Sequence, residues 1–238
     1  MGTESAGQTV FHFRRGWIYV LTLALVTINY MDRSALGVVA QAVRGEFGLS
    51  PVQMGFLFSS FLWSYVICLL PVGIMLDRLS ARNINSVGVT LWSLAMAATA
   101  GVWSFGTLLV TRLIMGAGEA TSIPSCGRIV REWMPAQERG AATVFWSAGS
   151  FVGPAIGAIV VAALTSAWGW RAAFIVLAAL GLVWLACNLI WFDKPERVSW
   201  LSEDERRLFN EAFERLDQEK VAQEQVIRDG AACLAGAL

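Results

Sequence analysis

Six long runs of apolar residues dominate the first 192 positions, and the polar and charged residues gather in the short segments between them. The runs cover approximately residues 17–40, 52–76, 84–104, 106–128, 141–166 and 172–192. Each is long enough for a helix to cross the roughly 30 Å of hydrocarbon in a bilayer. The pattern predicts an all-α, polytopic membrane protein with a six-helix transmembrane bundle over 17–192.

Polar segments flank the predicted bundle on both sides. Residues 1–16 form a short N-terminal segment, and residues 193–238 form a longer polar segment. Within the latter, Ser202 and Glu205 are spaced as a helix N-cap and its partner. An apolar stripe with charged flanks follows at Leu208, Phe209, Ala212, Phe213 and Leu216. We expect an amphipathic helix that lies against the bundle, with docking to a partner as the alternative.

The formal net charge of zero hides an uneven distribution of the charged residues. The first 192 residues carry 11 basic and 7 acidic side chains, whereas residues 193–238 carry 7 basic and 11 acidic ones. So few charges over 192 residues exclude a soluble enzyme. A nucleic-acid binder is also excluded, because it would need a clustered basic face and the sequence has none. The four cysteines have no metal-ligand spacing, and neither lysine belongs to a phosphate-binding loop. We therefore expect no metal, no cofactor and no catalytic residue.

The basic residues of the connecting segments predict the orientation. With the N-terminus in the cytoplasm, fourteen Lys and Arg residues fall on the cytoplasmic side and only Arg44 and Arg171 on the other. Cytoplasmic loops of membrane proteins carry such an excess. The sequence predicts a multi-pass protein of the cytoplasmic membrane with both termini inside.

Four ionisable residues lie within predicted spans: Asp32 and Arg33 in the first, Arg112 and Glu119 in the fourth. Each costs about 2.5–3.5 kcal/mol at the centre of a membrane helix, so such residues usually line a polar cavity. The alternative is a pair of salt bridges that serves assembly only. The charges occur in the first helix of each three-span set, as a 3+3 inverted repeat around a central site would place them.

The charges of these four residues sum to zero, and an organic anion that entered would leave a net charge of −1. Uptake of a proton by Asp32 or Glu119 would restore neutrality, because arginine does not release its proton at accessible pH. A freed guanidinium could then bind the anion through two hydrogen bonds. The charge count predicts that anion uptake is coupled to proton uptake, with the proton as the coupling ion.

Two glycine-containing motifs resemble those of the major facilitator superfamily. The loop from Gly73 to Arg82 contains Asp77 and Arg78, but Ser80 and Ala81 replace a usual glycine and a usual basic residue. In that family this loop is a latch that stabilises the outward-facing state. A second motif contains a glycine at every fourth position and a proline, which permit close helix packing and bending. Its residues are Gly149, Gly153, Pro154 and Gly157.

The segment from Asn29 to Arg33, together with Arg112 and Glu119, is similar to the anion:cation symporter branch of that superfamily. This branch includes permeases for hexuronate, galactonate and glucarate. The resemblance implies that Asp32 and Glu119 are protonation sites, that Arg33 binds the substrate carboxylate, and that Arg112 is the partner of Glu119.

The same resemblance implies substrate contacts from Tyr30 and Tyr65, with simple packing as the alternative. Ser150 is a further candidate substrate contact by the same resemblance, although galactonate permeases have a longer polar side chain near this position.

The family has twelve spans in two bundles, and this chain supplies one. We expect it to work with a missing C-terminal six-helix bundle, either from the same polypeptide in a full-length version or from a second copy. Its partners would be the lipid bilayer, a proton and a small organic anion. Two other functions stay open: a proton-coupled antiporter that exports amphipathic compounds, and a scaffold that transports nothing.

Overall fold

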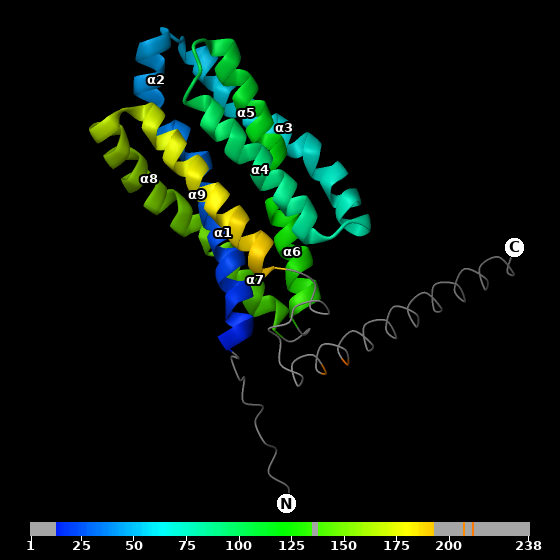
Figure 1. The fold of residues 1–238 in the computed structure, drawn as a ribbon. Helices are drawn as coiled ribbons and strands as arrows, with labels where there is room; N and C mark the ends of the chain where they lie inside the picture. The colour runs from blue at the N-terminus through cyan, green and yellow to red at the C-terminus, as the bar shows by residue number, and fades with distance from the viewer. Residues whose placement is uncertain (1–12, 135–137, 193–206, 208–210, 212–238) are drawn as a thin grey trace, which may run out of the picture. The chain divides into compact units, whose positions relative to one another are not determined.

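The computed structural model describes residues 13–134, 138–192, 207 and 211, and no strand occurs among them. The described part is a bundle of helices (Figure 1). The helices are α1 (Phe13–Val38), α2 (Ala40–Phe47), α3 (Pro51–Arg78), α4 (Ala81–Thr99), α5 (Phe105–Glu119), α6 (Ser122–Trp133), α7 (Arg139–Ser147), α8 (Gly149–Trp168) and α9 (Trp170–Trp191).

These helices follow the six predicted spans and confirm the all-α architecture. Helix α1 covers the first predicted span and α2 follows beyond its end, whereas α5 and α6 together cover the fourth span and α7 and α8 the fifth. Three helical stretches meet the length and hydropathy expected of a membrane span, namely 51–78, 139–168 and 170–191. The first and fourth spans carry the four charged residues, of which Asp32, Arg112 and Glu119 are buried.

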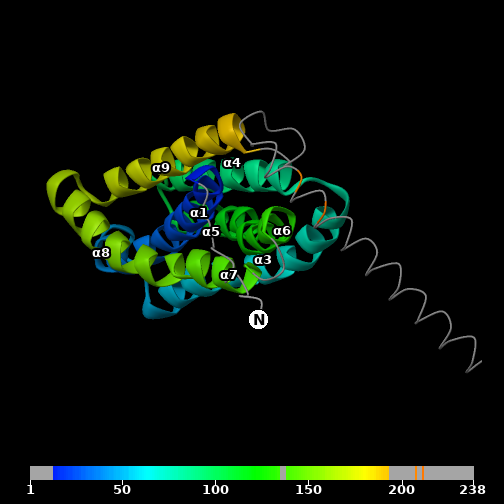
Figure 2. The same cartoon turned by 90° about the horizontal axis from the view of Figure 1, so that it is seen from below.

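The two spans that carry the charges occupy the middle of the bundle. Seen from the end, α1, α5 and α6 lie between α4 and α9 on one side and α3, α7 and α8 on the other (Figure 2). The packing agrees, because α1 contacts mainly α8 and α9, and α5 contacts mainly α3 and α4. Ionisable residues of both three-span sets are thereby brought to one central region.

The fourth span is interrupted where its buried carboxylate lies. Helix α5 ends at Glu119, and α6 begins at Ser122. Pro124 lies in the first turn of α6. A proline has no N–H to donate to the carbonyl four residues earlier, and its ring clashes with that carbonyl. That carbonyl belongs to Ala120, so the proline accounts for the break.

Close packing between helices depends on glycines, as the sequence predicted. A Cβ atom at Gly153 would meet the Thr27 carbonyl and the Cβ of Tyr30, which brings α8 onto α1. A Cβ atom at Gly118 would meet the backbone of Gly88 and Trp92, which brings α5 onto α4. Gly149 and Gly157 contact α1 in the same way as Gly153.

The loop between α3 and α4 is short and capped. The Ser80 hydroxyl accepts a hydrogen bond from the Asn83 amide and so caps the N-terminus of α4. The serine at this usual glycine position therefore has a structural role. Arg82 donates to the Leu189 carbonyl at the end of α9. Asp77 and Arg78 are exposed and form no ion pair with another described residue, and Gly73 faces open space.

Residues 194–238 form a separate unit from the bundle. Within it, Arg207 and Glu211 are helical and exposed. The apolar stripe from Leu208 to Leu216 and the N-terminal segment 1–12 lie outside the described residues.

Candidate functional site

An ion pair between α1 and the end of α5 lies at the centre of the site. The Nε of Arg33 donates to Oε2 of Glu119 at 2.7 Å. The Glu119 side chain is 0% exposed, whereas that of Arg33 is 20% exposed. The arginine thus connects a fully buried carboxylate to the accessible side of the bundle.

Three aromatic rings surround the Arg33 guanidinium. Its central carbon lies 4.8 Å from the ring centre of Tyr30, 4.5 Å from that of Tyr65 and 5.1 Å from that of Phe61. Aromatic faces attract a guanidinium and hold its plane. Tyr30 and Tyr65 therefore belong to the site, and their phenol groups lie beside the cation that the resemblance makes a substrate ligand.

Asp32 and Arg112 are buried next to this ion pair without hydrogen-bonding each other. Asp32 is 0% exposed, and neither of its carboxylate oxygens has a hydrogen-bond partner in the described part of the chain. Arg112 is also buried, its guanidinium lies 5.5 Å from the Phe174 ring centre, and its Nε and Nη2 are unpaired. Buried charged groups need partners, so water or a ligand is expected between them.

The observed pairing corrects one expectation from the resemblance. Arg112 was expected to be the partner of Glu119, but the structure pairs Glu119 with Arg33. Arg112 attracts both Glu119 and Asp32 at longer range. The physical reason is the geometry of the two central helices, because Arg33 projects from α1 toward the end of α5, whereas Arg112 lies two turns from Glu119 on its own helix.

Two residues of the site were not identified from the sequence. Asn29 is buried, and its amide donates to the Ser122 hydroxyl at 3.3 Å, which connects α1 to the break after Glu119. Phe61 supplies the third of the three aromatic side chains that surround the Arg33 guanidinium. Helical spacing could have found both, because Asn29 lies four residues before Arg33 and Phe61 four before Tyr65.

The remaining expected residues lie around this centre. The Ser150 hydroxyl donates to the Ser147 carbonyl at 2.7 Å, and no contact of its side chain with the four charges occurs among the described residues. Gly153 lies one turn further along α8 and contacts Tyr30. The loop residues Asp77, Arg78 and Arg82 lie at the far end of α3 and are not part of the central site.

A family model described as Major Facilitator Superfamily matches residues 22–238. The chain belongs to this superfamily. Its members are transporters and not enzymes, and the fold, the two glycine motifs and the central charges agree with it.

Curated relatives of the chain are transporters of sugar acids. It is 36% identical over 180 residues to a protein of Bacillus subtilis named probable galactarate/D-glucarate transporter GudP, with 71% of this chain and 40% of the relative covered. It is 34% identical to the D-galactonate transporter of Escherichia coli, with 78% of this chain and 43% of the relative covered. It is 32% identical to the hexuronate transporter of Bacillus subtilis, covering 71% and 40%. The anion:cation symporter branch is thereby matched, and the chain spans about two fifths of these relatives' length.

A solved structure has the same fold. It is a bacterial homologue of the human lysosomal transporter Spinster, inward-facing and unoccupied, with a TM-score of 0.70 and 23% identity. The match covers 83% of this chain and 45% of that one.

Proposed function

We propose that this chain is part of a proton-coupled symporter that moves a small organic anion across the cytoplasmic membrane by alternating access. The observation that carries the proposal is the ion pair between the partly exposed Arg33 and the buried Glu119. Sugar acids are the favoured substrates, since the relatives are named as transporters of galactarate, glucarate, galactonate and hexuronate. In the proposed orientation, both termini lie in the cytoplasm and the α2 end of the bundle faces outside.

Coupling follows from competition for one guanidinium. While Glu119 is ionised, it occupies the Arg33 side chain. A proton on Glu119 removes its charge, and Arg33 can then donate two parallel hydrogen bonds to a substrate carboxylate. Loss of that proton restores the pair and displaces the anion. Anion and proton therefore travel together.

Asp32 and Arg112 supply the second pair of opposite charges. Since neither is hydrogen-bonded to the other, Asp32 is available as a second proton acceptor. Tyr30 and Tyr65 hold the Arg33 plane and offer hydroxyl groups to a hydroxylated substrate. The second six-helix bundle would close the other side of this site.

The test uses the chain together with its second bundle, reconstituted in liposomes with labelled galactonate. In Glu119→Gln, the amide mimics the protonated acid, so counterflow exchange is retained, while accumulation driven by a pH gradient falls at least about tenfold. Glu132→Gln is the matched control, because Glu132 is paired with Arg128 in α6, away from this site. Gradient-driven accumulation by Glu119→Gln at the wild-type level would refute the role of Glu119.

The same liposomes separate the two alternative functions. An exporter of amphipathic compounds would extrude dyes and leave galactonate untouched, and two arginines within the spans, Arg33 and Arg112, disfavour a cationic cargo. A scaffold would give no flux of either compound even with the second bundle present. Galactonate counterflow would exclude the scaffold and would favour the symporter over the exporter.

A further inference from the structure

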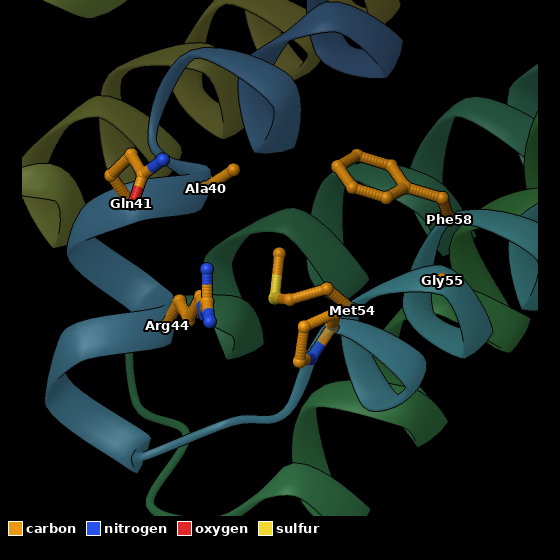
Figure 3. Close-up of a pocket in the computed structure, with 7 residues that line it drawn as sticks. Ala40, Gln41, Arg44, Met54, Gly55 and Phe58 are labelled. Carbon is orange, nitrogen blue, oxygen red and sulfur yellow. The ribbon is translucent and has the colours of Figure 1, made fainter.

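A pocket of about 380 Å³ lies at the α2 end of the bundle, between α2 and the start of α3. Figure 3 shows Arg44 on the α2 side, Phe58 on the α3 side and Met54 at the base between them. The pocket combines one cationic side chain with apolar walls. A small anion with a carbon body would meet both kinds of surface there.

Three described residues at this end of the bundle are charged, and Arg44 is the one without an opposite charge beside it. The other two are Glu46 and Arg171, which form an ion pair at 2.6 Å. The Nε of Arg44 donates to the Leu49 carbonyl at 3.2 Å, which holds the guanidinium over the pocket. Its two terminal nitrogens bond no other described residue, so they are available to an incoming anion.

The pocket lies on the same helix face as the central arginine. Arg44 follows Arg33 by eleven residues, which is close to three full turns. The helix ladder continues through the junction of α1 and α2, because the Val39 amide donates to Ala35 and the Val43 amide to Val39. The two residues therefore lie near one face of the α1–α2 segment, with backbone positions about 16 Å apart along the axis.

One face of α3 carries side chains that contact both the pocket and the surroundings of Arg33. Met54 and Phe58 line the pocket, and Phe61 and Tyr65 surround Arg33. These four residues are spaced by four, three and four positions, so they share one face of α3. Helices α1 and α3 make little direct contact with each other, since α1 packs on α8 and α9 and α3 packs on α5. Side chains on this face of α3 thus line the Arg44 pocket at one end and surround Arg33 at the other.

We propose that Arg44 and this pocket form an outer capture site for the carboxylate of a small organic anion, which then moves inward to Arg33. This inference rests on the proposed function and adds a second binding position to it. A cation at the edge of a pocket that no opposite charge neutralises attracts anions and raises their association rate. Arg44 binds the carboxylate transiently, and the apolar walls accept the carbon skeleton.

The test measures initial uptake of labelled galactonate by cells or right-side-out vesicles that carry the complete transporter. In Arg44→Gln, the KM for galactonate rises about two- to fivefold at low salt with little change in maximal rate, as expected for one exposed charge pair. The effect shrinks at high salt, because ions screen exposed charges. Arg44→Lys keeps the charge and stays close to the wild-type KM.

Two further variants keep the test specific. Arg131→Gln removes an exposed charge at the other end of the bundle and should leave the KM unchanged. Gly55→Leu fills the pocket without removing charge, and a Cβ atom at Gly55 meets no atom within 4 Å. We expect a raised KM in this variant at both low and high salt.

The outcomes separate this inference from the proposed function. If the wild-type transporter does not take up carboxylates, the proposed function fails. If it does, and Arg44→Gln has the wild-type KM at low salt, the capture site is refuted. The capture site is also refuted if the effect of Arg44→Gln disappears when anionic phospholipid is omitted from reconstituted vesicles, because Arg44 would then hold a lipid headgroup.

Discussion

The role of Arg33 depends on the shape of its side chain as well as its charge. The guanidinium donates to Glu119 and lies against three aromatic rings at the same time. A planar, forked group can do both, whereas an ammonium group is a compact point charge. Both contacts at position 33 therefore require the planar guanidinium of arginine.

Replacing Arg33 by lysine should separate charge from geometry. We expect Arg33→Lys to weaken galactonate binding by about ten- to a hundredfold, since charge-assisted hydrogen bonds contribute about 1.5–3 kcal/mol. The apparent affinity in counterflow measures this loss. Arg131→Lys is the matched control at an exposed position. Wild-type affinity in Arg33→Lys would show that charge alone is sufficient.

The sequence predicted that four charged residues lie within the spans, but it did not predict how they pair. Charge and apolar context alone placed Asp32, Arg33, Arg112 and Glu119 within the spans. Which arginine binds Glu119 depends on side-chain direction and on the approach of α1 to α5, and helical spacing does not encode these. The family resemblance implied Arg112 as the partner of Glu119, and the structure pairs Glu119 with Arg33.

At the scale of elements, the span positions were predictable and their interruptions were partly so. Each long apolar run became a helix or a pair of helices, because burial in lipid requires internally satisfied backbone groups. Pro124 is a visible signal in the sequence for the break after Glu119. No proline marks the junction of α1 and α2 at Val39, where the backbone hydrogen bonds continue on both sides.

Glycines at the helix contacts give a prediction at this scale. A Cβ atom at Gly118 or Gly153 would come too close to backbone atoms of the neighbouring helix. Because backbone cannot move aside easily, we expect Gly118→Ala and Gly153→Ala each to reduce the free energy of unfolding by about 1–3 kcal/mol. Thermal unfolding of the solubilised transporter measures the loss.

Gly127→Ala provides the control for these substitutions. Gly127 also lies in a helix, but a Cβ atom there meets nothing within 4 Å. Alanine is favoured over glycine within a helix, so this variant should be as stable as the wild type or slightly more stable. Equal stability of all three variants would contradict the close contacts of α5 with α4 and of α8 with α1.

At the scale of the whole bundle, one cluster at the α2 end ties the two three-span sets together. Glu46 of α2 accepts hydrogen bonds from Trp170 at 2.7 Å and from Arg171 at 2.8 Å, both at the start of α9. Arg171 also donates to the carbonyl of Val102 in the α4–α5 connection at 3.1 Å. The cluster thus joins α2, α9 and the segment between the two sets.

The charge of Glu46 makes this connection sensitive to acid. Hydrogen bonds from Arg171, and then from Trp170, lower the pKa of Glu46 below its ordinary value of 4.5. A carboxyl group with a lowered pKa stabilises the folded state above its ordinary value, and that stabilisation is lost as pH falls through the lower, folded value. We therefore expect the wild-type unfolding temperature to fall more than that of Glu46→Gln as the pH decreases below about 4.5.

Measuring unfolding temperatures of both proteins from neutral to acid pH tests whether the cluster joins the two sets. At neutral pH, Glu46→Gln should be slightly less stable than the wild type, because the pair is partly exposed and screened by water. At acid pH the two curves should converge, since protonated Glu46 and glutamine are both neutral. Parallel curves throughout would mean that Glu46 does not hold α9 through its charge, and that helix packing alone joins the two sets at this end.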